Sequence, residues 1–109
     1  MTNPIINAQS FKKIREIANP EELIGKTILR ICHMIGVVGE LLPDTIQVCE
    51  WIEGIRKYYP QYAPEELYLA CELNHYGKFN TKVEHYGKFS IDYLSNCLKL
   101  YEEKKQAEI

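Results

Sequence analysis

Prolines and glycines divide this sequence into short segments, and the residues around them are those that start and stop helices. In Asn19-Pro20, asparagine can cap a helix whose first residue is proline, and the glutamates that follow favour the helix dipole. Pro64-Glu65-Glu66 repeats the proline and the acidic first turn. Pro60 must end the segment before it, because proline has no amide hydrogen to donate. Apolar residues at helical spacing between these points predict helices over residues 20–36, 45–58 and 64–77.

Two further segments have helical signals of their own. Residues 7–18 carry a weaker apolar stripe, and Ser90 can cap a last helix whose apolar side chains follow at helical spacing to Tyr101. Gly36-Val37-Val38 and Lys82-Val83 are too short to build a sheet. The sequence therefore predicts an all-α fold, a single-domain bundle of four to five helices. We expect about six residues at each end of the chain to fray.

The composition excludes several classes of protein. A chain of 109 residues has room for one core and not for a two-domain enzyme. With 46% hydrophobic residues and 13 basic against 15 acidic side chains, it is neither disordered nor polybasic. The longest nearly uncharged run, Ile31 to Val38, is far shorter than the roughly 20 residues of a membrane span. The first residues lack the pattern of a secretory signal, so we expect a cytoplasmic protein whose cysteines are free thiols.

Charge and aromatic side chains are concentrated in the middle and second half of the chain. Residues 1–39 hold five basic and three acidic side chains, residues 40–75 two and seven, and residues 76–109 six and five. An acidic centre favours a protein partner over a phosphate backbone. Aromatic rings are enriched at interfaces, and a tryptophan that lies off the apolar stripe of its helix is a good anchor. We predict that the partner-binding face contains Trp51, Glu50, Glu53, Tyr58 and Tyr59.

Two patterns that suggest chemistry fail on their spacing. Gly25-Lys26-Thr27 matches the end of a nucleotide-binding P-loop, but Pro20 stands where that pattern requires glycine, and the residues fall inside a predicted helix. Cys71 and His75 lie four residues apart, so both could face one metal ion, but no second close pair completes the site. No carboxylate pair and no histidine with a plausible nucleophile is found at a telling spacing. We therefore expect no enzyme activity, no cofactor and no metal.

A pentapeptide occurs twice, as His75-Tyr76-Gly77-Lys78-Phe79 and as His85-Tyr86-Gly87-Lys88-Phe89. In a structural interpretation each glycine forms a left-handed turn, the first ending a helix and the second leading to the Ser90 cap, with the phenylalanines in the core. In a functional interpretation Lys78, Tyr86 and Lys88 contact the phosphates and bases of a single-stranded nucleic acid. We favour the structural interpretation, because each glycine falls where a left-handed turn is needed.

The second half of the chain resembles small proteins of phages and mobile elements from gut Bacteroidetes-type bacteria. The resemblance rests on the order of five short elements: Tyr59-Pro60, Pro64-Glu65-Glu66-Leu67, Gly77-Lys78-Phe79, His85-Tyr86-Gly87-Lys88-Phe89-Ser90 and Leu98-Lys99-Leu100-Tyr101. It covers residues 43–101. The helical layout is also similar to that of phage proteins that recruit, load or inhibit a replicative helicase and that lack an ATP site. This resemblance implies a non-enzymatic adaptor in the cytoplasm of a bacterial host.

The leading hypothesis is therefore an adaptor that binds a replication protein, such as the replicative helicase, through a helical face. Two alternatives remain open. The first is binding of single-stranded nucleic acid by the doubled pentapeptide, which predicts salt-dependent binding. The second is a virion component or an antagonist of host defence, a role that a small helical domain could also fill.

Overall fold

The computed structural model describes residues 3–108, and within them the fold is all-α, as the sequence predicts. These residues form five α-helices, joined by loops and two short 3-10 turns, and contain no strand. The helices are α1 (Pro4–Gln9), α2 (Glu21–Met34), α3 (Thr45–Tyr58), α4 (Pro64–His75) and α5 (Ile91–Glu108), and the 3-10 turns are Ile14–Glu16 and Gly39–Leu41.

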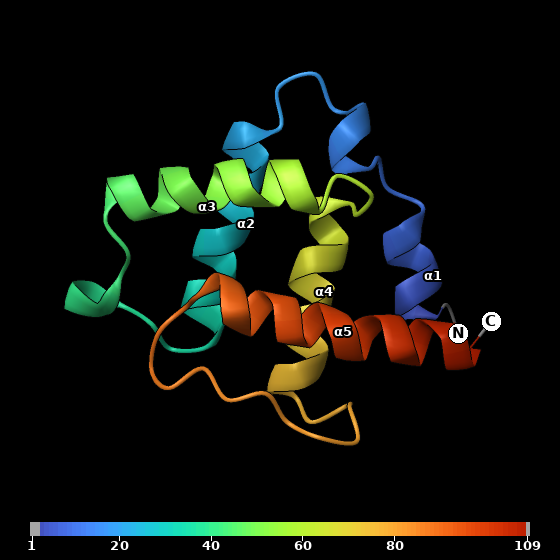
Figure 1. The fold of residues 1–109 in the computed structure, drawn as a ribbon. Helices are drawn as coiled ribbons and strands as arrows, with labels where there is room; N and C mark the ends of the chain where they lie inside the picture. Colours follow the sequence, from blue (N-terminus) through green and yellow to red (C-terminus); the bar gives the residue numbers. More distant parts are fainter. Residues whose placement is uncertain (1–2, 109) are drawn as a thin grey trace.

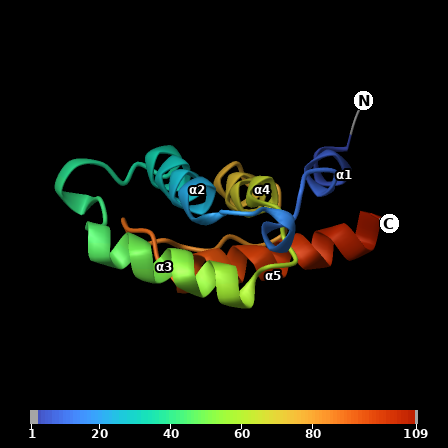
Figure 2. The same cartoon turned by 90° about the horizontal axis from the view of Figure 1, so that it is seen from above.

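The helices form two layers that cross each other. Helices α1, α4 and α2 lie side by side in one layer, and α3 and α5 form the other (Figure 2). In Figure 1 the helices of the second layer run across those of the first. Helix α4 is central, because it packs against α1, α2 and α5. The outward face of the α2 and α4 pair is left uncovered by the second layer.

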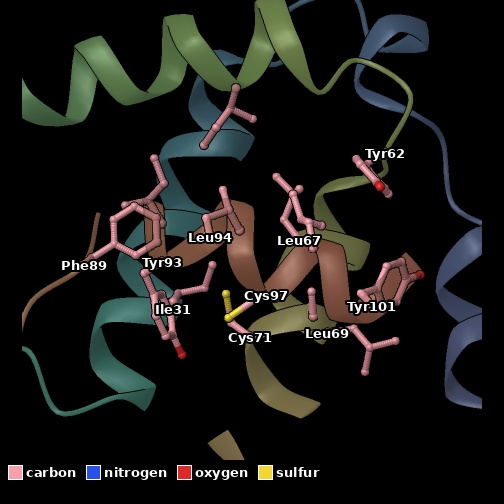
Figure 3. Packing of buried hydrophobic residues seen from close by; sticks show 14 of the residues in the cluster. Ile31, Tyr62, Leu67, Leu69, Cys71, Phe89, Tyr93, Leu94, Cys97 and Tyr101 are labelled. Atoms are coloured by element: carbon pink, nitrogen blue, oxygen red, sulfur yellow. The ribbon is translucent and has the colours of Figure 1, made fainter. Parts of the chain in front are cut away.

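The core lies between the two layers (Figure 3). Ile31 of α2 and Leu67 and Cys71 of α4 meet Leu94 and Cys97 of α5 there, and all five side chains are buried. Four of these residues belong to the apolar stripes that periodicity predicts for α2, α4 and α5, and Cys97 adds to the predicted stripe of α5. Burial of these side chains between the two layers holds α5 across α2 and α4.

Local capping explains why two helices begin where the sequence predicts. The Asp44 carboxylate accepts a hydrogen bond from the Gln47 amide (2.8 Å), and the Gln47 side chain accepts one from the Asp44 amide (3.3 Å), which starts α3. The predicted Ser90 cap is confirmed, because its hydroxyl accepts from the Tyr93 amide at 3.1 Å. Helix α2 begins one residue later than expected, with Pro20 and not Asn19 at the cap position.

The predicted helix over residues 7–18 is wrong. Helix α1 ends at Gln9, and Ile14–Glu16 form a separate 3-10 turn. The amide of Ile14 donates to the Tyr62 carbonyl (2.8 Å), and that of Arg15 donates to the Pro60 carbonyl (3.0 Å). Because these amides bond to the loop between α3 and α4, they are not available to a continuous helix.

Helical structure extends close to both ends of the described chain. Helix α1 begins at Pro4 with Asn3 as its cap, and α5 continues to Glu108. The Asn3 amide group donates to the Glu108 carboxylate at 2.8 Å, and Lys104 pairs with the same side chain at 3.2 Å. These contacts join the two ends of the described chain, and residues 1, 2 and 109 of the segments predicted to fray lie outside it.

The buried carboxylate of Glu66 connects Lys13, which precedes the 3-10 turn Ile14–Glu16, to the core. Glu66 is 1% exposed, and its carboxylate accepts hydrogen bonds from the Ala63 amide (3.0 Å), the Tyr101 hydroxyl (2.7 Å) and the Lys13 ammonium group (3.1 Å). One side chain thus joins the segment before Ile14 to α4 and α5. No buried side-chain nitrogen or oxygen among the described residues lacks a hydrogen-bond partner.

Candidate functional site

The structure places Trp51 and Tyr59, two members of the predicted partner-binding face, at the edge of the core. Trp51 is half-buried and packs edge to face on Phe89, with 5.0 Å between the ring centroids. The hydroxyl of Tyr59, which is also half-buried, donates to the Ser95 hydroxyl at 2.9 Å. Trp51 thus packs on the loop that precedes α5, and Tyr59 bonds to α5 itself. Both side chains are therefore already engaged within the fold.

The other three predicted residues are exposed but do not form one surface. Glu50 and Glu53 follow Ile46 at i+4 and i+7, so these side chains share the outward face of α3. Glu53 lies 3.7 Å from Arg56, which neutralises part of its charge. Tyr58 lies on a different side of the helix. The predicted face is therefore divided, and Glu50 is the member best placed for a partner.

The most exposed apolar region of this part of the chain was not predicted from the sequence. Val38, Leu41, Leu42 and Ile46 are between 44% and 72% exposed, although they lie within nine consecutive residues. Single exposed aliphatic residues are ordinary, but a cluster marks a contact surface. We call these four side chains, with the carboxylates of Glu40, Asp44 and Glu50, the docking surface.

Backbone geometry explains why this segment stands away from the core. Val37 is buried, and its amide donates to the Cys32 carbonyl at 2.8 Å, so the loop is anchored at its start. Gly39 then takes a φ of 62°, a left-handed conformation that turns the chain outward into the 3-10 turn. Figure 1 shows this turn projecting from one end of the two layers before α3 begins.

The docking surface is strongly acidic. Residues 38–53 contain four carboxylates and no lysine or arginine. Among the described residues, Glu40, Asp44 and Glu50 form no ion pair. An apolar patch with an unpaired acidic rim complements a surface that combines apolar residues with lysine or arginine.

The doubled pentapeptide forms two different left-handed turns, which agrees with the structural interpretation of its glycines. Gly77 has a φ of 70°, and the Lys78 amide donates to the Leu73 carbonyl at 2.8 Å, which ends α4. In the second copy Tyr86 and Gly87 both have positive φ, at 54° and 78°. The chain reverses there, before α5 begins.

The phenylalanines of the two copies differ in burial. Phe89 is buried and packs on Trp51 and Tyr93, as expected of a residue before the helix cap. Phe79 is only half-buried at the margin of the core. The side chain of Asn74 accepts from the Val83 amide and donates to its carbonyl, at 2.8 and 3.0 Å, so the loop between the copies is held against α4.

The structure separates the residues proposed to bind nucleic acid. Lys78 lines a hollow against the second half of α5, together with Leu100 and Lys104. Tyr86 and Lys88 line a different hollow at the start of α5. All three proposed residues are exposed, but they do not form one continuous site.

The structure places Cys71 and His75 in different surroundings. Cys71 is buried beside Cys97, and burial raises the pKa of its thiol well above the usual value, which disfavours the thiolate that binds metal. The His75 ring packs on Tyr76 instead, at 4.9 Å between centroids. Residues 3–108 contain no group of three or more side chains suited to a metal ion.

No helix in this range is long and apolar enough to span a membrane.

The chain matches no known family model, no curated protein and no solved structure.

Proposed function

We propose that this chain is a non-enzymatic adaptor of phage or mobile-element origin that binds a replication protein, such as the replicative helicase, in the host cytoplasm. The observation that carries the proposal is the docking surface, where four exposed aliphatic side chains lie among unpaired carboxylates. The choice of a replication protein rests on the sequence resemblance of residues 43–101.

The charge of the docking surface favours a basic partner over a second copy of the same chain. In a symmetric dimer through this surface, the carboxylates of one copy would face those of the other, and like charges across an interface oppose association. A partner with lysine or arginine around an apolar centre avoids that repulsion. The proposed partner surface therefore combines apolar residues with a basic rim.

Affinity purification from host cells tests the proposal with a matched pair of variants. Ile46→Ser removes an exposed side chain from the docking surface, and Ile6→Ser removes a similarly exposed isoleucine from α1. We expect the tagged chain to recover a replication protein. Ile46→Ser should lower its recovery about tenfold or more, as loss of a central interface contact does, and Ile6→Ser should leave it unchanged.

Three results would contradict the proposal. The first is recovery of no replication protein. The second is equal recovery by Ile46→Ser and the unmodified chain. The third is a stable dimer that Ile46→Ser dissociates, because the docking surface would then bind a second copy. Incorporation of the chain into purified virions, without a bound replication protein, would favour the virion role instead.

A further inference from the structure

A groove runs along the outward face of the first layer, and none of its lining residues belongs to the docking surface. It lies between α2 and α4, has a volume of about 830 Å³, and is lined on the α2 side by Lys26, Leu29, Arg30 and His33. Its α4 side is formed by Tyr68 and Tyr76. The groove is shallow and open to solvent, and it combines apolar side chains with cations and aromatic rings.

The three basic side chains of α2 lie on the same side of the helix. Lys26, Arg30 and His33 stand at i, i+4 and i+7, which places them on one face of the helix. Gly25 and Thr27, the neighbours of Lys26 in the pattern that resembles a P-loop, are instead buried. Any phosphate bound here would therefore contact side chains and not a glycine-rich loop.

Arg30 is held in place by an aromatic ring. Its guanidinium carbon lies 4.0 Å from the centre of the Tyr68 ring, a stacked arrangement that leaves its N–H groups free at the edges. Within residues 3–108 no carboxylate pairs with Arg30. Guanidinium groups bind phosphate through two parallel hydrogen bonds, so a positioned, unpaired arginine suits a phosphate.

Tyr76 supplies an exposed ring at the end of α4. It is 64% exposed, and His75 packs against it edge to face. The turn that ends α4 requires glycine at position 77 but makes no demand on its neighbour, so the exposed ring has no evident role in the fold. Leu29, which is 47% exposed, adds apolar surface to the same groove.

Two carboxylates limit the charge of this region. Glu22 pairs with Lys26 at 3.2 Å, but both side chains are well exposed and such pairs contribute little, so a phosphate can displace the glutamate. Glu72 lies one helical turn from both Tyr68 and Tyr76, so its negative charge is close to the α4 side of the groove. The groove therefore suits one or two phosphates and not a long phosphate backbone.

We propose that this groove binds a nucleotide, with its phosphate on Lys26, Arg30 and His33 and its base stacked on Tyr76. Stacking on an exposed tyrosine together with a basic contact is a common way to hold a nucleotide with little base preference. The nucleotide is either free in solution or part of a short single strand, since both present a base beside a phosphate. An adaptor with this groove would carry a nucleotide site on one face and a protein contact on another.

Nuclear magnetic resonance titrations of the ¹⁵N-labelled chain test the proposal. The probes are adenosine monophosphate and an oligoadenylate of about six residues, near the length that one small single-strand site covers, at about 50 mM salt. We expect saturable shifts of the amides around Arg30 and Tyr76. Arg30→Gln and Tyr76→Leu should each weaken binding about tenfold, whereas Tyr76→Phe, which keeps the ring, should bind as the unmodified chain does.

The controls separate this groove from the rest of the surface. Arg15→Gln removes an exposed arginine from the 3-10 turn and should leave binding unchanged. Ile46→Ser should also have no effect, so failure of the docking surface and failure of the groove can be distinguished. Equal affinity for both probes would indicate a free nucleotide, and tighter, salt-sensitive binding of the oligoadenylate would indicate a single strand. No saturable shift up to about 1 mM of either probe, or full binding by Arg30→Gln, would overturn the proposal.

Discussion

Removal of one hydroxyl group, in Tyr101→Phe, should destabilise the fold strongly. The Tyr101 hydroxyl donates to the Glu66 carboxylate at 2.7 Å, and both side chains are buried. Hydrogen bonds to charged groups contribute about 1.5–3 kcal/mol, and the substitution leaves a buried carboxylate oxygen without its donor. Because the phenylalanine ring fills almost the same space, no cavity term adds to this loss. We expect the free energy of unfolding to fall by about 2 kcal/mol.

Urea unfolding at pH 7, followed by circular dichroism and by the fluorescence of Trp51, measures this change. A domain of this size has a total stability of about 5–15 kcal/mol, so the expected loss is large, and it should lower Tm by roughly 10 °C. Tyr58→Phe is the matched control. Tyr58 is exposed and makes no hydrogen bond through its hydroxyl among the described residues, so its loss should change stability by less than about 0.5 kcal/mol.

The reasoning would be refuted if Tyr101→Phe were as stable as Tyr58→Phe. That result would mean that the Glu66 carboxylate is satisfied by Lys13 and Ala63 alone. It would also mean that the hydrogen bond between Tyr101 and Glu66, which connects α5 to α4, contributes little to the fold.

Two further predictions concern the backbone conformation of Tyr86 and the ionisation of the buried tyrosines. Tyr86 is 86% exposed and has a left-handed backbone conformation, which asparagine tolerates better than tyrosine does. Tyr86→Asn should therefore raise the urea midpoint by the equivalent of about 0.5–1 kcal/mol. An unchanged or lower midpoint would contradict backbone strain at Tyr86. Burial raises the pKa of Tyr62, Tyr93 and Tyr101 in the folded chain. Above about pH 10 these tyrosines ionise more readily in the unfolded chain than in the folded chain. Their contribution to stability is therefore complete below about pH 10 and is lost as the pH rises further. Urea midpoints measured from pH 9 to 11 should therefore fall, and fall less steeply in Tyr101→Phe; parallel curves would count against the shift of Tyr101.

The parts of the fold that could be predicted from the sequence are those fixed locally. Helix α3 has the predicted bounds, because Asp44 caps one end and Pro60 forbids its continuation. The segment after α1 could not be predicted, because its amides bond to Tyr62 and Pro60, which lie more than forty residues away. Periodicity describes one segment at a time and contains no information about such partners.

The candidate sites were harder to predict than the fold. Apolar periodicity identified the side chains able to face the core, but it did not show that the segment from Val38 to Leu42 would remain uncovered. Its place off the apolar stripe predicts that Trp51 is free to bind a partner, but Phe89, which is distant in the sequence, packs against it. The groove joins residues 26–34 with residues 68–76, which only the packing of α2 on α4 brings together.

Site-specific photo-crosslinking in host cells tests the central claim, that the docking surface binds a replication protein, most directly. A photoreactive amino acid at position 46 lies within the docking surface, and the same group at position 6 is an exposed control on α1, since Ile46 is 72% and Ile6 58% exposed. We predict that position 46 gives a covalent adduct with a replication protein, at a basic surface of that protein, and that position 6 gives none. Equal adducts from both positions, or no replication protein in the adduct from position 46, would contradict the claim.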